Sequence, residues 1–312
     1  MTDRTEFTRL TSPFQRELLV HCYRMLGSVH DAEDLVQETY LRAWRAYDNF
    51  EGRASLRTWL YRIATSACLT ALDHKSRRML PSGLGGPSDN PELPAVQELS
   101  VPWLQPLPDD PAAVVAERDS VRLAMIAALQ HLPARQRAVL ILRDVLSWQA
   151  SEVAELLDTS TAAVNSALQR ARGLLDRIAP TEDDTAGPVE PEQRALLEQY
   201  LEAFQNADID ALLRVLKEDV VLEMPPHTTW FSGRDDVLAF LRRQVITEPD
   251  LFRMVPVSAN GQPAAAVYRR GDDGAYHAVE IQVLSVGATG IGRITVFFEP
   301  DLFGWFGLPE SQ

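Results

Sequence analysis

The chain has 312 residues, of which 46% are apolar and 24% charged, and this globular composition excludes a wholly disordered chain. No run of about eighteen apolar residues is long enough to span a membrane, and the N-terminus lacks the apolar core of a signal peptide. The two cysteines, Cys22 and Cys68, do not have metal-ligand spacing. We therefore predict a reduced, cytoplasmic protein without a metal or another cofactor.

The net charge of −14 is unevenly distributed along the chain. Residues 1–79 carry a net charge of +2 and residues 113–179 carry +1, whereas residues 180–312 carry −12. Residues 80–112 hold five acidic residues and no lysine or arginine. The acidic charge therefore lies outside residues 1–79 and 113–179. For this reason, the total charge of the chain does not exclude nucleic-acid binding by these two segments.

Two stretches have the composition of linkers. Residues 80–112 contain eight prolines and three glycines, a density that disfavours helices and sheet ladders. Residues 180–190 are short, acidic and poor in apolar side chains. The linkers divide the chain into three folded segments, at 12–79, 113–179 and 191–312.

Helical spacing of apolar side chains runs through the first segment. It predicts a helix that ends at Gly27, a second that begins near Asp31, and a third that begins after Ser55 as its N-cap. Trp59 lies in the apolar stripe of the third helix, so we interpret it as a core residue. The opposite face of that helix is predicted to present Arg57, Tyr61, Arg62 and Thr65.

The second segment is also helical and ends in two short helices separated by Asp158, Thr159 and Ser160. Ser147 and Ser160 are the predicted N-caps, and Asp158 can take the left-handed conformation that a tight turn needs. This arrangement is typical of a helix-turn-helix, although a plain helical hairpin on a surface has the same pattern.

The third segment changes period after residue 190. Helices are predicted first, then a strand at 220–224, a helix at 234–243, and strand-like runs at 252–259, 264–270, 276–285 and 291–298. Turn signals such as Asn260-Gly261 separate the runs. The predicted fold class is therefore multidomain: two all-α domains, the second with a helix-turn-helix, followed by an α+β domain with a curved meander.

Both helical segments carry side chains suited to nucleic acid. In the second helix of the helix-turn-helix, asparagine and glutamine can pair with adenine in the major groove, and arginine can bind guanine or phosphate. In the first segment, aromatic and basic side chains alternate through the loop at 47–54 and the following helix. Stacking rings beside cations suit single-stranded DNA, and this interpretation is favoured over a core position for Phe50 and Tyr61.

The same residues resemble a known family. DAEDLVQETYLRAW at 31–44, FEG at 50–52 and LRTWLYRIA at 56–64 resemble region 2 of extracytoplasmic-function (ECF) sigma factors of the sigma-70 family. The stretch from LPARQR at 132–137 to QRAR at 169–172 resembles their region 4. The resemblance implies two partners, core RNA polymerase and promoter DNA.

The resemblance also implies a role for individual residues. Region 2 would read the −10 element as a separated strand through Asn49, Phe50, Arg53, Arg57, Tyr61, Arg62, Lys75, Arg77 and Arg78. Region 4 would read the −35 element as duplex through Arg135, Arg137, Thr161, Ala162, Asn165, Ser166, Gln169, Arg170 and Arg172. The polymerase β′ clamp helices would bind Asp34, Gln37, Glu38, Leu41, Arg42 and Arg45, with the β subunit as a further partner.

The proline-rich linker would run through the polymerase between the two regions. Its extended reach of about 110 Å exceeds the roughly 70 Å between two elements that lie about two DNA turns apart. An ordinary disordered spacer is the alternative interpretation.

The third segment resembles a SnoaL-like domain of the nuclear-transport-factor-two superfold. The resemblance lies in MPPH at 224–227, WFSGR at 230–234, ANGQP at 259–263 and FGLP at 306–309. It implies a domain that regulates the sigma factor in cis, and WLQPLPD at 103–109 is similar to linkers of the same subgroup. The apolar residues 303–309 are predicted to pack on the sheet of this domain, with the linker or the second helical segment as the alternative site.

Two other functions remain open for the chain. One is a regulator that binds duplex DNA without polymerase. The other is a small-molecule-binding or enzymatic SnoaL-like domain fused to a DNA-binding front end, although we expect no enzyme because paired catalytic groups are not evident. Its pocket would hold an unknown small ligand near Glu223, His227, Trp230, His277 and Glu280, with Glu280 pointing inward beside Gln282.

Overall fold

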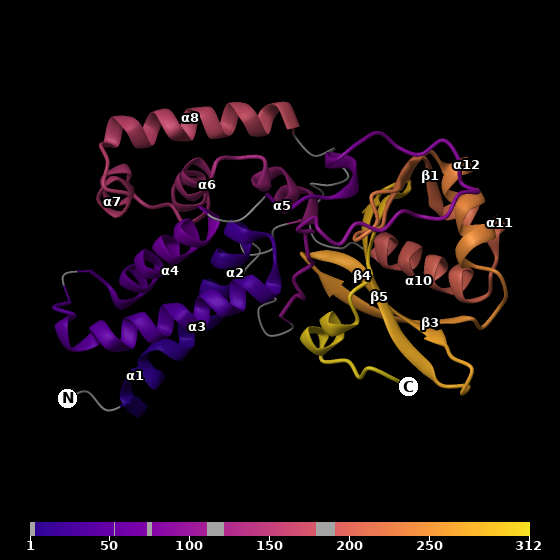
Figure 1. Ribbon diagram of the computed structural model, residues 1–312, viewed down its shortest axis with the longest axis horizontal. Helices are drawn as coiled ribbons and strands as arrows, with labels where there is room; N and C mark the ends of the chain where they lie inside the picture. The colour runs from indigo at the N-terminus through magenta and orange to yellow at the C-terminus, as the bar shows by residue number, and fades with distance from the viewer. Residues whose placement is uncertain (1–3, 53, 74–76, 111–121, 179–190) are drawn as a thin grey trace. The chain divides into compact units, whose positions relative to one another are not determined.

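A computed structural model of the protein describes residues 4–52, 54–73, 77–110, 122–178 and 191–312 (Figure 1). The chain forms two compact units, each built from two separate stretches of sequence. The first contains residues 1–78 and 125–179, and the second contains residues 79–124 and 180–312. The linker therefore belongs to the same unit as the C-terminal domain.

The first helical segment contains α1 (Arg4–Thr11), α2 (Gln15–Leu26), α3 (Val29–Ala46) and α4 (Leu56–Leu72). Gly27 ends α2 with a φ of 72°, as predicted. Ser28 and Ser55 cap α3 and α4 by accepting hydrogen bonds from the amides of Asp31 and Thr58. The prediction of Ser55 as an N-cap is confirmed, whereas α1 was not predicted.

The second helical segment contains α5 (Leu123–Gln130), α6 (Ala134–Leu140), α7 (Ala150–Leu156) and α8 (Thr161–Ile178). A π-helical turn, Ile141–Val145, continues α6. Asp158 has a φ of 48° and Ser160 accepts a hydrogen bond from the amide of Ala163, as predicted. The predicted N-cap at Ser147 is wrong: Gln149 caps α7 in a capping box with Glu152, which satisfies two helix-end amides at once. Part of the helix expected after residue 113 lies outside the described residues.

In the first unit, α4 packs against α2, α3 and α6. This position explains why Tyr61 and Thr65 are buried, with exposed fractions of 1% and 0%, although the sequence pattern placed them on an open face. Thr65 hydrogen-bonds the buried His21 of α2 at 2.9 Å. A single apolar stripe predicts one buried face, but neighbours on several sides of α4 bury more than one.

The C-terminal domain begins with α10 (Pro191–Gln205) and α11 (Ile209–Val215). Its strands are β1 (Leu216–Glu223), β2 (Trp230–Ser232), β3 (Phe252–Ala259), β4 (Gln262–Arg270), β5 (Tyr276–Gly287) and β6 (Gly290–Phe297), and α12 (Arg234–Phe240) precedes β3. They form one sheet in the order β2-β1-β6-β5-β4-β3, in which β1 is parallel to β6 and the other pairs are antiparallel. Helix α10 packs across β3, β4, β5 and β6. The predicted helices and strands are confirmed, whereas the three-residue β2 was not predicted.

The end of the chain packs against this sheet. A 3₁₀ helix, Pro300–Phe306, buries Leu302 and Phe303 completely. The Phe303 ring meets the ring of Tyr268 on β4 edge to face at 5.0 Å, and the Tyr268 hydroxyl donates a hydrogen bond to the Pro309 carbonyl. The predicted packing of residues 303–309 on the domain's own sheet is confirmed. The linker is also close by, because Gln105 donates a hydrogen bond to Glu299 at 2.6 Å.

The linker follows the surface of the C-terminal domain, as the violet trace in Figure 1 shows. Apart from one 3₁₀ turn, Pro81–Gly83, residues 80–110 form no regular helix or strand, as their proline content predicts. Trp103, Leu104 and Leu107 are nevertheless buried, with at most 6% of their surface exposed. The described part of the linker is therefore an ordered element of this unit, and the interpretation as a disordered spacer is wrong.

Candidate nucleic-acid interface

Helix α8 presents a continuous polar face. Val164, Leu168 and Ala171 are buried beneath the helix, so the residues between them point outward. Six of the predicted duplex-reading residues are exposed on it: Thr161, Ala162, Asn165, Ser166, Gln169 and Arg170. The geometry fits insertion of this face into a major groove, and contact with DNA stays a prediction.

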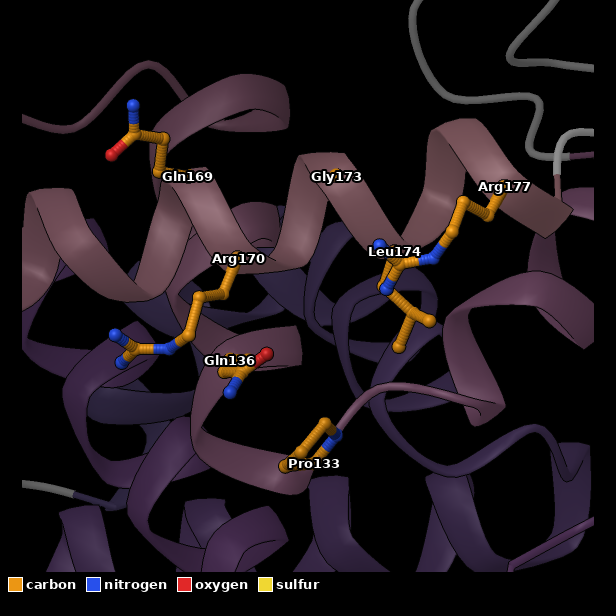
Figure 2. Close-up of a pocket in the computed structure, with 7 residues that line it drawn as sticks. All are labelled: Pro133, Gln136, Gln169, Arg170, Gly173, Leu174 and Arg177. Atoms are coloured by element: carbon orange, nitrogen blue, oxygen red, sulfur yellow. The ribbon is translucent and has the colours of Figure 1, made fainter.

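An open groove of about 550 Å³ runs between the N-terminal end of α6 and the C-terminal half of α8 (Figure 2). Arg170 and Leu174 point from α8 toward α6, while Gln169 points away from it. The groove is lined by Pro133, Gln136, Gln169, Arg170, Gly173, Leu174 and Arg177, and acidic side chains do not line it. Guanidinium and amide groups in an open channel suit a phosphate backbone.

Gln136, Gly173 and Arg177 also belong to this surface, although the sequence pattern did not predict them. A Cβ on Gly173 would meet nothing within 4 Å, so α8 leaves open space at this point of the groove. The spacing of Arg170 and Arg177, seven residues or two helical turns apart, was the signal that could have found the second arginine.

Two predicted DNA contacts of the second helical segment have other partners. Arg172 forms a bidentate pair with Asp144, with nitrogen–oxygen distances of 2.6 and 2.9 Å, and this carboxylate raises the pKa of Arg172. Arg137 is only 3% exposed, so its predicted contact with the DNA backbone is wrong. Arg135, two residues earlier, is exposed as expected.

Arg137 instead connects the two helical segments. It donates hydrogen bonds to the carbonyl oxygen of Met25 at the end of α2, to Gln130 at 2.6 Å and to the carbonyl of Leu132. Burial lowers the pKa of Arg137 to about 10, with the nearby charge of Arg77 as a second cause. The two terminal nitrogens of this buried guanidinium donate to neutral oxygens, and the bond to Met25 ties α6 to α2.

The predicted single-strand surface is partly covered by its own unit. Arg57 pairs with Glu17 at 2.6 Å, and its guanidinium lies 4.9 Å from the centre of the Tyr61 ring. Burial raises the pKa of Tyr61, whose hydroxyl donates a hydrogen bond to Glu17. Tyr61 is therefore not exposed for stacking with a base in this state, contrary to the prediction.

The helix-turn-helix lies directly on this surface. Arg62 on α4 pairs with Glu155 on α7 at 2.8 Å, and the pair lowers the pKa of Glu155. The ring of Tyr61 meets the ring of Trp148, which precedes α7, at 6.3 Å. The two predicted DNA-reading surfaces are thus held together in one compact unit.

The other predicted single-strand residues are distributed around the start and the end of α4. Asn49 is exposed, and Phe50 is half-buried with its ring 4.8 Å from that of Trp59. Arg77 is exposed, while Arg78 pairs with Asp31 at 2.6 Å. Arg53 and Lys75 lie outside the described residues.

Helix α3 carries the predicted polymerase-binding face. Val36, Thr39 and Ala43 are buried on one side, and Leu41 on the other side has 57% of its surface exposed. Arg42 pairs with Glu38 at 2.6 Å, one turn earlier. Asp34, Gln37 and Arg45 are exposed on the same helix. Leu41 is thus an exposed apolar side chain among charged ones, and binding of this face to polymerase stays a prediction.

The candidate pocket residues of the C-terminal domain do not form one site. Glu223 is fully buried between Arg293 at 2.6 Å and the amide of Ser82 in the linker. His277 is exposed and pairs with Asp273 at 3.0 Å. His227 hydrogen-bonds the carbonyl of Met224, and the Trp230 indole donates to the carbonyl of Gly85 in the linker. The prediction of a common pocket for these residues is wrong, because the linker takes up polar groups that a ligand would need.

Glu280 occupies a separate, buried position. Its carboxylate accepts a hydrogen bond from Gln282 at 2.6 Å, and Gln282 accepts one from the Tyr200 hydroxyl of α10 at 2.7 Å. Burial raises the pKa of Glu280 to about 7, although the hydrogen bond from Gln282 opposes this shift. The predicted inward orientation beside Gln282 is confirmed.

Neither a metal cluster nor a membrane-spanning helix is evident in the described residues. Groups of three or more histidine, cysteine, aspartate or glutamate side chains that could hold a metal ion do not occur among them. Within the same ranges, we find no helix of the length and hydropathy required to cross a membrane.

Comparison with known protein families matches each folded segment. Residues 10–78 match Sigma-70 region 2, residues 122–175 match Sigma-70, region 4, and residues 197–296 match the SnoaL-like domain. The ECF RNA polymerase sigma factor SigG of Mycobacterium tuberculosis is 49% identical to the chain over 316 residues, covering 99% of this chain and 85% of SigG. The chain belongs to the ECF sigma factors. The resemblance drawn from the sequence is therefore confirmed for all three segments.

Other relatives agree with this assignment. ECF sigma factor SigJ of Mycobacterium tuberculosis is 28% identical over 73% of this chain and 69% of SigJ. The crystal structure of SigJ superimposes with a TM-score of 0.63 at 24% identity and covers 98% of this chain and 100% of that chain, which supports the shared fold. Both relatives are ECF RNA polymerase sigma factors.

Proposed function

We propose that this ECF sigma factor binds core RNA polymerase through α3, reads the −35 element with α8 and the −10 element with the loop and helix around Phe50, and is regulated in cis by its SnoaL-like domain. The observation that carries the proposal is the exposed polar face of α8 on a capped helix-turn-helix. This face sits in the same chain as α3, whose Leu41 is exposed among charged side chains.

Duplex reading is assigned to the first half of α8. Asn165 and Gln169 carry amides that can pair with a base edge, whereas Arg170 faces the groove and suits a phosphate. Arg172 is engaged with Asp144, so we now assign it a structural role in the free protein.

Single-strand reading requires a change of state. Arg62 and Tyr61 are held against α7 and Trp148, and Arg137 ties α6 to α2. Two promoter elements that lie about two DNA turns apart cannot be contacted at once by two surfaces that are held together in one compact unit. We therefore propose that the helical segments separate when polymerase and promoter are bound.

Regulation in cis is assigned to the C-terminal domain because it holds the linker. Backbone amides of Ser88 and Glu98 donate to carbonyl groups of Trp230 and Pro226 in this domain, at 2.8 and 2.9 Å. A domain that binds the segment between the two DNA-reading regions can influence how far apart they move. A ligand is not required for this function, and we do not propose one.

The test is transcription by purified core polymerase with the full-length chain on genomic DNA of the source organism, followed by sequencing of the RNA 5′ ends. The expected result is a set of start sites that core polymerase alone does not use, all preceded by two shared sequence elements. Start sites identical to those of core polymerase alone would contradict the proposal. Binding to duplex DNA without any new start sites would favour a regulator that works without polymerase.

A further inference from the structure

Backbone hydrogen bonds close most of the linker into a loop on the C-terminal domain. The amide of Met79 donates to the carbonyl of Pro102 at 3.2 Å, and the amide of Leu104 donates to the carbonyl of Met79 at 3.1 Å. Residues 80–103 therefore form a loop whose two ends are paired side by side. Those residues add nothing to the distance that the linker can span while this pairing persists.

The body of this loop is held by the domain. The amide of Ser82 donates to the buried carboxylate of Glu223 at 2.9 Å. Farther along, the amide of Thr228 donates to the carbonyl of Val96 at 2.8 Å. Outside the loop itself, Leu104 and Leu107 are buried in the same unit. The loop is therefore bound to the domain by hydrogen bonds of its main chain, and two buried leucines follow it in the sequence.

The turn between β3 and β4 and the first residue of β4, together Asn260–Gln262, form a second point of attachment. The Asn260 side-chain oxygen accepts from the amide of Leu107, and the Asn260 amide donates to the Leu107 carbonyl, both at 2.9 Å. The Asp109 carboxylate accepts from the amide of Gly261 at 2.8 Å and also from the Ser258 hydroxyl. Asn260 has a φ of 57°, a conformation that asparagine tolerates better than most residues.

The same turn also holds the start of region 4. The amide of Leu123, the first residue of α5, donates to the Gln262 side-chain oxygen at 2.8 Å. Gln262 is 2% exposed, and its amide group donates to the carbonyl of Leu284. Leu107 and Leu123 lie near the two ends of the stretch that leads to α5. They bind Asn260 and Gln262, which are only two positions apart, so both ends of this stretch are held at one place.

These attachments shorten the connection between the regions. The chain from Met79 to Leu123 could extend to about 150 Å if it were free. In the bound state, the shortest connected route from Met79 to Leu123 uses the hydrogen bonds instead. It passes from Met79 to Leu104 by a hydrogen bond, follows the chain to Leu107, and reaches Leu123 through Asn260–Gln262. The length of this route is roughly 30 Å. Release of residues 107–109 and of Leu123 from the turn would raise this limit to about 65 Å.

From this arrangement we propose that the C-terminal domain is a length lock on the linker, and that the turn Asn260–Gln262 is its central clamp. While the clamp is closed, regions 2 and 4 start from points too near each other to separate freely. Opening of the clamp supplies the linker length that promoter binding needs. The proposal rests on the proposed function, because only a promoter with two separate elements makes linker length important.

The first test measures the separation of the two regions in the free, full-length protein. Spin labels on cysteines introduced at Glu33 and Asp176, both exposed, report the distance between α3 and α8 by pulsed electron paramagnetic resonance. The native Cys22 and Cys68 are fully buried and so are shielded from the label. Asn260→Gly removes the side-chain acceptor while preserving the left-handed backbone, and Asn260→Asp keeps an acceptor oxygen as the matched control.

Both variants also carry Arg62→Gln, which removes the ion pair with Glu155 that holds the two helical segments together directly. In this background, the lock predicts a longer and broader distance distribution with Asn260→Gly and an unaltered distribution with Asn260→Asp. An unchanged distribution in Asn260→Gly would overturn the proposal. Because this measurement needs neither polymerase nor DNA, its result is independent of whether the proposed function is correct.

The second test closes the clamp covalently. Pro108 and Ala259 are directly opposite each other in an antiparallel bridge whose flanking hydrogen bonds make them a closely spaced pair. Their spacing suits a disulfide in a Pro108→Cys, Ala259→Cys variant, with each single cysteine variant as control. Core polymerase with the oxidised variant should give several-fold less promoter transcript than with the reduced variant, and a thiol reductant should restore it.

Equal transcription by the oxidised and reduced forms would overturn the lock. If the reduced variant and the unsubstituted protein both fail to start transcription, the proposed function fails instead. In that case, the distance measurement alone decides on the lock.

Discussion

Arg170 and Arg172 are two positions apart in α8 but have different surroundings. Arg170 lines an open groove, while Arg172 is paired with Asp144. Each phosphate contact contributes about 0.9 to the slope of log affinity against log salt concentration. We therefore expect Arg170→Gln to reduce this slope by about 1 and Arg172→Gln to reduce it by less. The measurement is promoter binding by the holoenzyme from about 50 to 200 mM salt.

Equal changes in slope for the two variants would contradict this assignment, because they would show that Arg172 leaves Asp144 to bind phosphate. Asn165→Ala serves as control, since the loss of an uncharged side chain should leave the salt dependence unchanged.

Glu280 gives the C-terminal domain a dependence on pH. Its pKa is raised by burial to about 7 from an ordinary value near 4.5, so the folded state binds the proton more tightly than the unfolded state. The stability that this proton contributes is present below pH 4.5 and is lost as the pH rises to 7. Glu280→Gln keeps an acceptor for Gln282 and removes the titration, so it should be more stable than the parent at pH 8, by up to about 3 kcal/mol.

Denaturant unfolding of both proteins between pH 4.5 and 8 measures this effect. The difference in unfolding free energy should grow with pH up to about 7 and then level off. A difference that is constant with pH would mean that Glu280 does not titrate in this range.

At the scale of elements, α3 provides the clearest test of polymerase binding. Leu41 is 57% exposed, so Leu41→Asp should change the unfolding free energy by no more than about 0.5 kcal/mol. A charge in the centre of an apolar contact should nevertheless reduce co-purification with core polymerase at least tenfold. Leu213→Asp on α11, where the leucine is 42% exposed, is the matched control. Full retention of Leu41→Asp on core polymerase would refute the assignment of this face.

Element boundaries were predictable where a local signal exists. Gly27, Ser55, Asp158 and the turn at Asn260 each act through their own backbone or a residue three positions away. Ser147 failed because Gln149 and Glu152 form a better cap two residues later. The short β2 has too few residues for a pattern, and its position depends on pairing with β1.

At the scale of the whole molecule, the features that sequence could not predict are the non-local ones. Polarity placed Tyr61 and Arg137 on open surfaces, but packing of α4 and α6 against other helices buries both. Glu223 looked like a pocket acid, yet Arg293 and the linker amide of Ser82 satisfy it. The linker itself has no helix or strand pattern, because its order comes from hydrogen bonds to residues more than a hundred positions away.

The central claim is that α8 reads promoter bases as part of a polymerase holoenzyme. The most direct measurement is run-off transcription by core polymerase with the full-length chain, or with Asn165→Ala, on a promoter and its single-base −35 variants. The account predicts that Asn165→Ala loses discrimination at one −35 position, about 5- to 150-fold, and keeps it at the others. A uniform loss at every −35 position would contradict the claim that Asn165 reads a base.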